Sequence, residues 1–180
     1  LTDQTVFEEL RVDPFYRHLA EKFPDFRPQI EMTIAQMSAN PLCLVLGDFS
    51  PKNILITGHE IVLVDFETGH RGDPAFDLGF FLSHLLLKSI YHADRFNDYA
   101  ELTRSFWDAY FQGMRPLTNP AMQPDPLLQR TFAHLAGCMW SRVDATSPVD
   151  YLTQETQQKL VRNFSHQLLS DPPTTWEEVL

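Results

Sequence analysis

Long apolar segments, cysteines and basic residues are all scarce in this chain of 180 residues. Because no run of about 18 apolar residues occurs, we expect no transmembrane helix and no membrane partner. No signal peptide is visible either. The two cysteines, Cys43 and Cys138, each lie in an apolar stretch. We therefore expect free, buried thiols and a cytoplasmic location, since disulfides persist mainly in oxidising compartments.

The shortage of basic residues argues against one class of partner. The chain has 14 basic and 24 acidic residues, which gives a formal net charge of −10. A nucleic-acid-binding protein needs a basic patch, so we expect no nucleic-acid partner. The length and a hydrophobic content of 43% fit one globular domain over residues 1–180 with a sizeable core.

The most informative stretch is residues 42–77, where polar side chains stand beside short apolar runs. Three of these runs are rich in strand-forming residues, and they are Cys43–Gly47, Asn53–Ile56 and Ile61–Asp65. The four residues from Thr57 to Glu60 fit a hairpin loop between the last two runs. Strand ends can hold polar side chains rigidly beside a cleft, so we expect a site here.

The spacing of three of these polar residues indicates phosphoryl transfer. Asp48 and Asn53 fit D-x-x-x-x-N, the catalytic-loop pattern of kinase-type enzymes, in which the aspartate takes the proton of the attacking hydroxyl. Asp65, in VLVDFE, stands where such enzymes have the second metal-binding aspartate. Asn53 and Asp65 could supply the hard oxygen ligands that Mg²⁺ prefers.

The segments GDFSPKNIL, VDFE and GDPAFDL together resemble the aminoglycoside phosphotransferase and choline-kinase-like family, which is related to protein kinases. The resemblance implies that Asp48 is the catalytic base and that Asn53 and Asp65 bind Mg²⁺ and nucleotide. It also implies that Asp77 is a structural support, bound by backbone N–H groups of the loop around Asp48. Lys52 could contact phosphate, and a solvated surface lysine is an equally good interpretation.

Two positions depart from the family pattern. The family usually has histidine directly before the Gly-Asp pair, where this chain has Leu46. That histidine orients the loop, so its loss bears on loop geometry more than on the base. Protein kinases have glycine after Asp-Phe, where this chain has Glu67.

The resemblance implies transfer of the γ-phosphoryl of ATP or GTP to a hydroxyl of a small acceptor, with Mg²⁺. A kinase-like enzyme also needs a nucleotide-binding lobe with a glycine-rich loop and a strand lysine. No glycine precedes Gly47, and Lys22 lies in a helical pattern. We therefore expect the C-terminal lobe of such an enzyme, without the nucleotide-binding N-terminal lobe and inactive by itself.

A second interpretation stays open, namely a non-catalytic binding or regulatory module on the same fold. Leu46 and the missing nucleotide-binding lobe support it. Mg²⁺-dependent nucleotide binding and hydrolysis in the full-length protein would separate the two. The sequence does not fix the acceptor, since relatives of this fold serve many hydroxyl compounds.

The expected fold is α+β and mostly helical, with a small β-hairpin that carries the catalytic and metal residues. Apolar spacing predicts a first helix that begins at Asp13-Pro14, with Pro14 in its first turn. The segment 75–90 is apolar on every face and predicts a buried central helix. Further helices are predicted at 28–39, 94–113, 125–143 and 153–169, and a loop at 67–74.

Three polar positions allow two interpretations each. For Asp73 we favour capping of the following helix over a place in the cleft. For His84 we favour a core role over catalysis, because no partner is evident. For Arg142 and Asp144 we favour structural contacts over binding of a polar acceptor.

Overall fold

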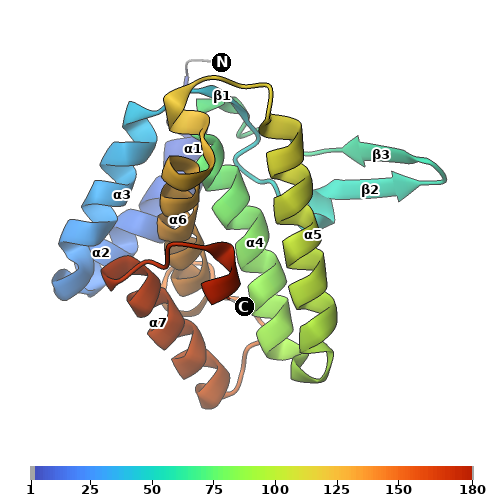
Figure 1. Cartoon of the computed structure of the whole chain (residues 1–180). Helices are drawn as coiled ribbons and strands as arrows, with labels where there is room; N and C mark the ends of the chain where they lie inside the picture. The colour runs from blue at the N-terminus through green and yellow to red at the C-terminus, as the bar shows by residue number, and fades with distance from the viewer. Residues whose placement is uncertain (1–2, 180) are drawn as a thin grey trace.

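The computed structural model describes residues 3–179. It is mostly helical, with two small antiparallel sheets (Figure 1). The main helices are α1 (Thr5–Phe7), α2 (His18–Lys22), α3 (Arg27–Ala39), α4 (Pro74–Tyr91), α5 (Phe96–Met114), α6 (Pro124–Asp144) and α7 (Glu155–Ser170). The predicted α+β, mostly helical composition is confirmed, and it is compatible with a kinase-like lobe.

The N-terminal helix begins earlier than the sequence predicted. A π-helical segment, Glu8–Arg17, joins α1 to α2 and has Pro14 inside it. The predicted start at Asp13-Pro14 was therefore wrong. Proline removes one backbone donor from a helix, and the wider π turn is a known way for a helix to accommodate such a disruption. Phe15 and Tyr16, which follow Pro14 within this segment, are both buried.

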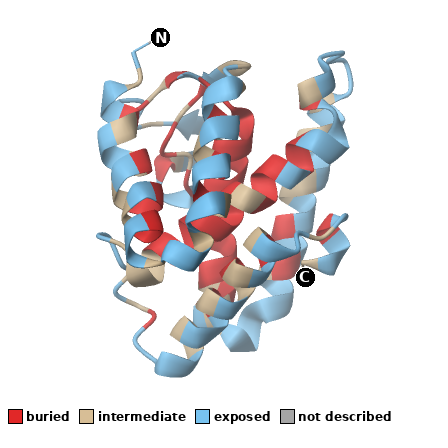
Figure 2. Ribbon diagram, turned by 90° about the vertical axis from the view of Figure 1, so that its left-hand side faces the viewer, coloured by how far each residue is buried: buried red, intermediate tan, exposed pale blue. Residues whose placement is uncertain are grey.

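The central helix is α4, as the apolar sequence predicted. Thirteen of its eighteen residues are buried, and Figure 2 shows buried residues concentrated in the middle of the helical body. α4 packs closely against α6. At Gly79 a Cβ atom would lie 2.6 Å from the Cβ of His134, so only glycine allows the two helices to approach this closely.

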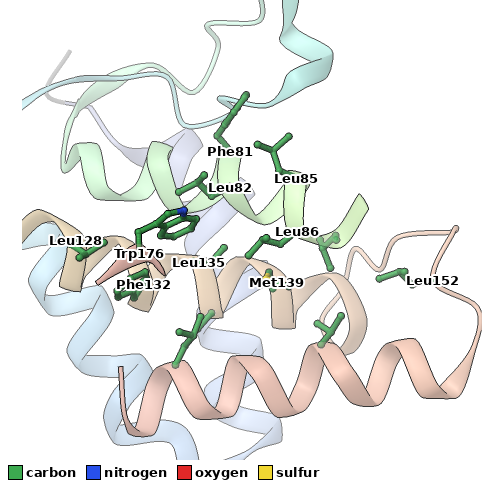
Figure 3. Packing of buried hydrophobic residues seen from close by; sticks show 14 residues of the cluster. Phe81, Leu82, Leu85, Leu86, Leu128, Phe132, Leu135, Met139, Leu152 and Trp176 are labelled. Carbon is green, nitrogen blue, oxygen red and sulfur yellow. The ribbon is translucent and has the colours of Figure 1, made fainter. Parts of the chain in front are cut away.

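The largest hydrophobic cluster lies between α4, α6 and α7 (Figure 3). Leu82 and Leu86 of α4 face Leu135 and Met139 of α6 across it. Trp176, in a short 3₁₀ turn near the C-terminus, stacks on Phe132 at a centroid distance of 5.7 Å and closes one end. This cluster makes α4 a rigid base for the loops at its N-terminal end.

Two pairs of strands lie at that end of α4. Strands β2 (Ile54–Thr57) and β3 (Glu60–Leu63) form the predicted hairpin. Its turn contains two residues, not four, and begins with Gly58 at φ +59°, as two-residue hairpins require. The hairpin projects away from the helices (Figure 1), and its Ile56 and Ile61 are 76% and 71% exposed.

The second strand pair corrects a prediction. Strand β1 (Cys43–Val45) pairs with β4 (His70–Gly72), in the register Cys43 with Gly72 and Val45 with His70. The segment 67–74 was predicted to be a loop, which was wrong over these three residues. Strand pairing depends on the partner segment more than on local sequence, so β4 has little signal of its own.

Both cysteines are free thiols, as predicted. Cys138 is buried in α6, but the prediction of a buried thiol was wrong for Cys43, which is half-buried in β1 because that two-stranded sheet lies at the surface end of α4. Within residues 3–179, no helix is long and apolar enough to cross a membrane.

Candidate active site

The loop between β1 and β2 is held in place by Asp77, in the first turn of α4. The backbone N–H of Leu46 donates to Asp77 Oδ2 at 2.6 Å, and that of Gly47 donates to Oδ1 at 2.9 Å. On the other side, Thr68 Oγ1 donates to the carbonyl oxygen of Leu46 at 2.7 Å. The N–H and C=O groups of Leu46 are therefore both hydrogen-bonded to side chains far away in the sequence, those of Asp77 and Thr68. The side chain of Leu46 makes none of these hydrogen bonds.

Gly47 lets the chain turn from β1 into the loop. Its φ is +70°, in the left-handed region that favours glycine. A Cβ atom there would lie 2.7 Å from Thr68 Oγ1 and 3.0 Å from a ring carbon of Phe7. Glycine is therefore needed at position 47, both for the left-handed φ and because a Cβ atom would clash with Thr68. The chain turns here, between β1 and Asp48.

Asp48 is 7% exposed and lies among three donors. Its Oδ1 is 3.1 Å from Nη2 of Arg11, and its Oδ2 is 3.0 Å from Nζ of Lys52. Asn53 Nδ2 also donates to Oδ2, at 3.1 Å. A carboxylate has about four lone-pair sites, so these contacts leave one site, on Oδ1.

Arg11 fixes this loop from the N-terminal helix. Besides its ion pair with Asp48, its Nε donates to the carbonyl oxygen of Gly47 at 2.8 Å. The two residues are 36 positions apart. Sequence analysis did not find Arg11, because nothing near it in the chain indicates such a distant contact.

Asn53 joins the loop to Asp65. Its Nδ2 donates to the backbone and side-chain oxygens of Asp48 and, at 3.5 Å, to Asp65 Oδ2. Asn53 ends the 3₁₀ turn Pro51–Asn53 directly before β2, and Asp65 follows β3. The two paired strands thus bring residues 48, 53 and 65 into one hydrogen-bonded group.

Asn53 and Asp65 carry oxygen atoms of the kind that a divalent cation such as Mg²⁺ binds. The amide nitrogen of Asn53 is engaged, which leaves its carbonyl oxygen as the possible ligand. Asp65 is exposed at φ +68°, and no basic side chain in the described part of the chain pairs with it. No group of three or more His, Cys, Asp or Glu residues suited to metal binding occurs among the described residues. Mg²⁺ needs fewer, because water and phosphate supply most of its ligands.

Comparison with known protein families identifies the family to which this chain belongs. A family model described as the phosphotransferase enzyme family matches residues 3–118. The chain belongs to this family. The match covers the loop, the hairpin and α4, and it confirms the resemblance to aminoglycoside phosphotransferases and choline kinases. A search of curated proteins found no match.

In this member of the phosphotransferase family, Asp77 is a partly buried carboxylate with a raised pKa. Burial raises the pKa of Asp77 to about 6, while the hydrogen bonds from Leu46 and Gly47 act in the opposite direction. Its two oxygens both accept hydrogen bonds from the loop backbone, which are the contacts that the resemblance implied for this residue.

Asp73 caps α4 and forms a buried ion pair. Its Oδ1 accepts the backbone N–H of Ala75 at 3.0 Å, in agreement with the interpretation favoured from sequence. Its Oδ2 lies 2.6 Å from Nε of Arg130 on α6. Sequence analysis missed this pairing between α4 and α6.

Arg142 and Asp144, at the end of α6, contact different residues. Asp144 forms an ion pair with Arg162 at 2.7 Å and accepts the indole N–H of Trp140 at 2.9 Å. It is therefore structural. The guanidinium of Arg142 instead lies over the rings of Phe15 and Phe80, 5.0 and 5.7 Å from their centroids.

His84, on α4, lies in the same neighbourhood as Arg142. Its Nε2 is buried and has no hydrogen-bond partner in the described structure. Burial, followed by the charge of Arg142, lowers the pKa of His84 to about 4, and the charge of Asp48 acts in the opposite direction. A neutral histidine that packs on Phe80, at a centroid distance of 5.0 Å, fits these facts.

Proposed function

We propose that this chain is the catalytic, acceptor-binding lobe of a small-molecule kinase that transfers the γ-phosphoryl of ATP or GTP to a hydroxyl. The supporting observation is the network in which the Asn53 amide donates to the carboxylates of both Asp48 and Asp65. These residues have the spacing of a kinase catalytic loop and its metal-binding aspartate.

Asp48 is the proposed base. The lone-pair site left on its Oδ1 is where the acceptor hydroxyl would donate its proton. Arg11 on Oδ1, and Lys52 and Asn53 on Oδ2, fix the carboxylate in one orientation. Phosphoryl transfer depends mainly on positioning and electrostatic stabilisation, so this rigidity is the main contribution of the loop.

Asn53 and Asp65 are the proposed ligands of Mg²⁺, which neutralises the phosphate charge when bound. The side chain of Lys52 is 66% exposed, so its Nζ can turn from Asp48 towards a phosphate oxygen. Asp77 supports the loop. The nucleotide itself needs a second lobe with a glycine-rich loop, and we propose that the lobe described here is inactive by itself.

The test is a phosphorylation screen of small hydroxyl compounds with the full-length protein, Mg²⁺ and either ATP or GTP. We expect Asp48→Asn to lower turnover by about 100-fold to 10,000-fold, the usual contribution of a general base. Nucleotide binding should stay unchanged. Asp108→Asn, the same change at an exposed aspartate of α5, should leave turnover unchanged.

Two results would count against this proposal. Unchanged turnover in Asp48→Asn would remove the role of the base. Absence of phosphoryl transfer, together with absence of Mg²⁺-dependent nucleotide hydrolysis, would favour the non-catalytic module.

A further inference from the structure

Lys88 and Arg142, two basic side chains of the helical body, make no ion pair with a carboxylate within residues 3–179. Lys88 lies on α4, one helical turn after His84, and Arg142 lies in the last turn of α6. The charges of both act on the pKa of His84, as does that of Asp48. Unpaired cations stand out in a chain with a net charge of −10.

Arg142 shares its aromatic support with Arg11. Arg11, which contacts Oδ1 of Asp48, lies over the rings of Phe15 and Phe80 at 5.9 and 5.5 Å. Arg142 lies over the same two rings. The buried aromatic pair therefore carries both guanidinium groups, one of which contacts the Asp48 oxygen proposed to face the acceptor hydroxyl.

The guanidinium of Arg142 has donors to spare. Among residues 3–179 it makes one hydrogen bond, from Nη1 to the carbonyl oxygen of Ser147 at 3.2 Å, and no ion pair. Asp144, two positions later, is occupied by Arg162. Burial lowers the pKa of Arg142, since removing a cation from water is unfavourable, and the charge of Asp48 acts in the opposite direction. An arginine fork matches a carboxylate or phosphate in geometry.

Lys88 is a second cation without a carboxylate in the described structure. Its Nζ lies 3.7 Å from the ring centroid of Tyr151, in the segment after α6. The Tyr151 hydroxyl is buried and has no hydrogen-bond partner among the described residues. Lys88 and Tyr151 thus place a cation beside a buried hydroxyl, and the charges of Arg142 and Asp150 both act on the pKa of that hydroxyl.

We propose that the acceptor carries an anionic group, a carboxylate or a phosphate, that Arg142 binds with the help of Lys88 while the acceptor hydroxyl faces Asp48. This inference rests on the proposed function and names the acceptor class for it. A cationic acceptor, such as an amino sugar or an amino alcohol, would meet two unpaired cations and is disfavoured. Burial of an unpaired charge is costly, so the anion also relieves an unfavourable feature of the free protein.

The test compares matched compounds that differ in one group. One series has three carbons: 3-amino-1,2-propanediol, glycerol, glycerate and glycerol 3-phosphate. The other has a sugar ring: glucosamine, glucose, glucuronate and glucose 6-phosphate. Binding to the full-length protein is measured calorimetrically with Mg²⁺ and a non-hydrolysable ATP analogue, so the result does not depend on turnover.

In at least one series, we expect the carboxylate or the phosphate member to bind about tenfold or more tightly than the amino member, the effect of one charged hydrogen-bonded contact. The stronger of the two anions identifies the group. Arg142→Gln should abolish this preference. Arg104→Gln, the same change at an exposed arginine of α5, should retain it. If Arg142→Gln does not fold, as judged by circular dichroism, Lys88→Gln should weaken the preference several-fold.

The inference is overturned if the amino members bind as tightly as the anions, if no member binds, or if the preference survives both Arg142→Gln and Lys88→Gln. Phosphoryl transfer to amino compounds that still requires Asp48 would overturn the inference alone. Selective anion binding without any phosphoryl transfer would instead count against the proposed function.

Discussion

Asp77 accepts a hydrogen bond of 2.6 Å from the backbone N–H of Leu46, 31 positions earlier in the chain. This contact attaches the loop that carries Asp48 to the most buried helix of the protein. In this chain Leu46 replaces the histidine that the family usually has at this position. Since Asp77 and Thr68 bind the backbone of Leu46, we expect the position of the loop to depend on these two contacts more than on the Leu46 side chain.

The pH dependence of stability is expected to show the burial of Asp77. Its pKa is about 6 in the folded chain, against an ordinary value of 3.8. Between these values the folded state binds more protons at Asp77 than the unfolded state does, so the contribution of Asp77 to stability is greatest below pH 4 and is lost as the pH rises through 6. The shift corresponds to up to about 3 kcal/mol. Urea unfolding of the wild type and Asp77→Asn across this range measures it, and parallel curves would contradict the prediction.

Gly47→Ala is expected to destabilise the protein more than Gly58→Ala. Both glycines have positive φ, but a Cβ at Gly58 would meet nothing within 4 Å. Gly58→Ala should therefore cost only the backbone strain, about 1–2 kcal/mol. Gly47→Ala adds the clash with Thr68 and should cost at least about 1 kcal/mol more. Chemical denaturation of both variants measures the loss of stability. Equal losses would contradict the prediction, because they would show that Thr68 and Phe7 make room for the Cβ atom without destabilising the fold.

Thr68→Val is expected to harm the protein more than Leu46→Ala. The valine keeps the shape of threonine but leaves the carbonyl of Leu46 without its hydrogen bond, which should cost about 1–3 kcal/mol. Turnover of the full-length protein should fall with it, because the loop that carries Asp48 loses one attachment. Leu46→Ala keeps both backbone contacts and should have turnover close to the wild type. A larger loss of kcat in Leu46→Ala would show that the side chain positions the loop.

Arg130→Met is expected to be strongly destabilising, since it leaves Asp73 buried without its partner. The Asp73 side chain is fully buried and that of Arg130 is 9% exposed. Breaking a buried pair in this way costs about 3–5 kcal/mol. Arg95→Met breaks the pair with Asp98, in which both side chains are 63% exposed, and should cost less than about 1 kcal/mol. Urea unfolding compares the two, and similar losses would contradict this account.

The sequence predicted the elements whose signal is local. α4 was predicted because its apolar residues cover every face, and the hairpin because two strand-forming runs flank a turn with glycine. The family was predicted from residues 42–77, and the family match confirms it. The roles of Asp48, Lys52, Asn53, Asp65 and Asp77 stay predictions.

The features that the sequence did not predict depend on contacts between distant segments. Strand β4 exists only because β1 lies beside it, and Pro14 is accepted only because the helix widens around it. The ion pair of Arg11 with Asp48 joins the N-terminal helix to the proposed site. The ion pair of Arg130 with Asp73 joins α6 to the start of α4. An arginine on a helix face has no local pattern that names its partner.

The attachment of the loop to Asp77 makes the orientation of Asp48 depend on folding. The two backbone groups that orient the loop donate to an acceptor on α4 that lies 31 and 30 positions further along the chain. We therefore expect a chain in which α4 has not formed to lack an aligned Asp48, so that the activity proposed for this lobe begins only once this part of the fold is in place.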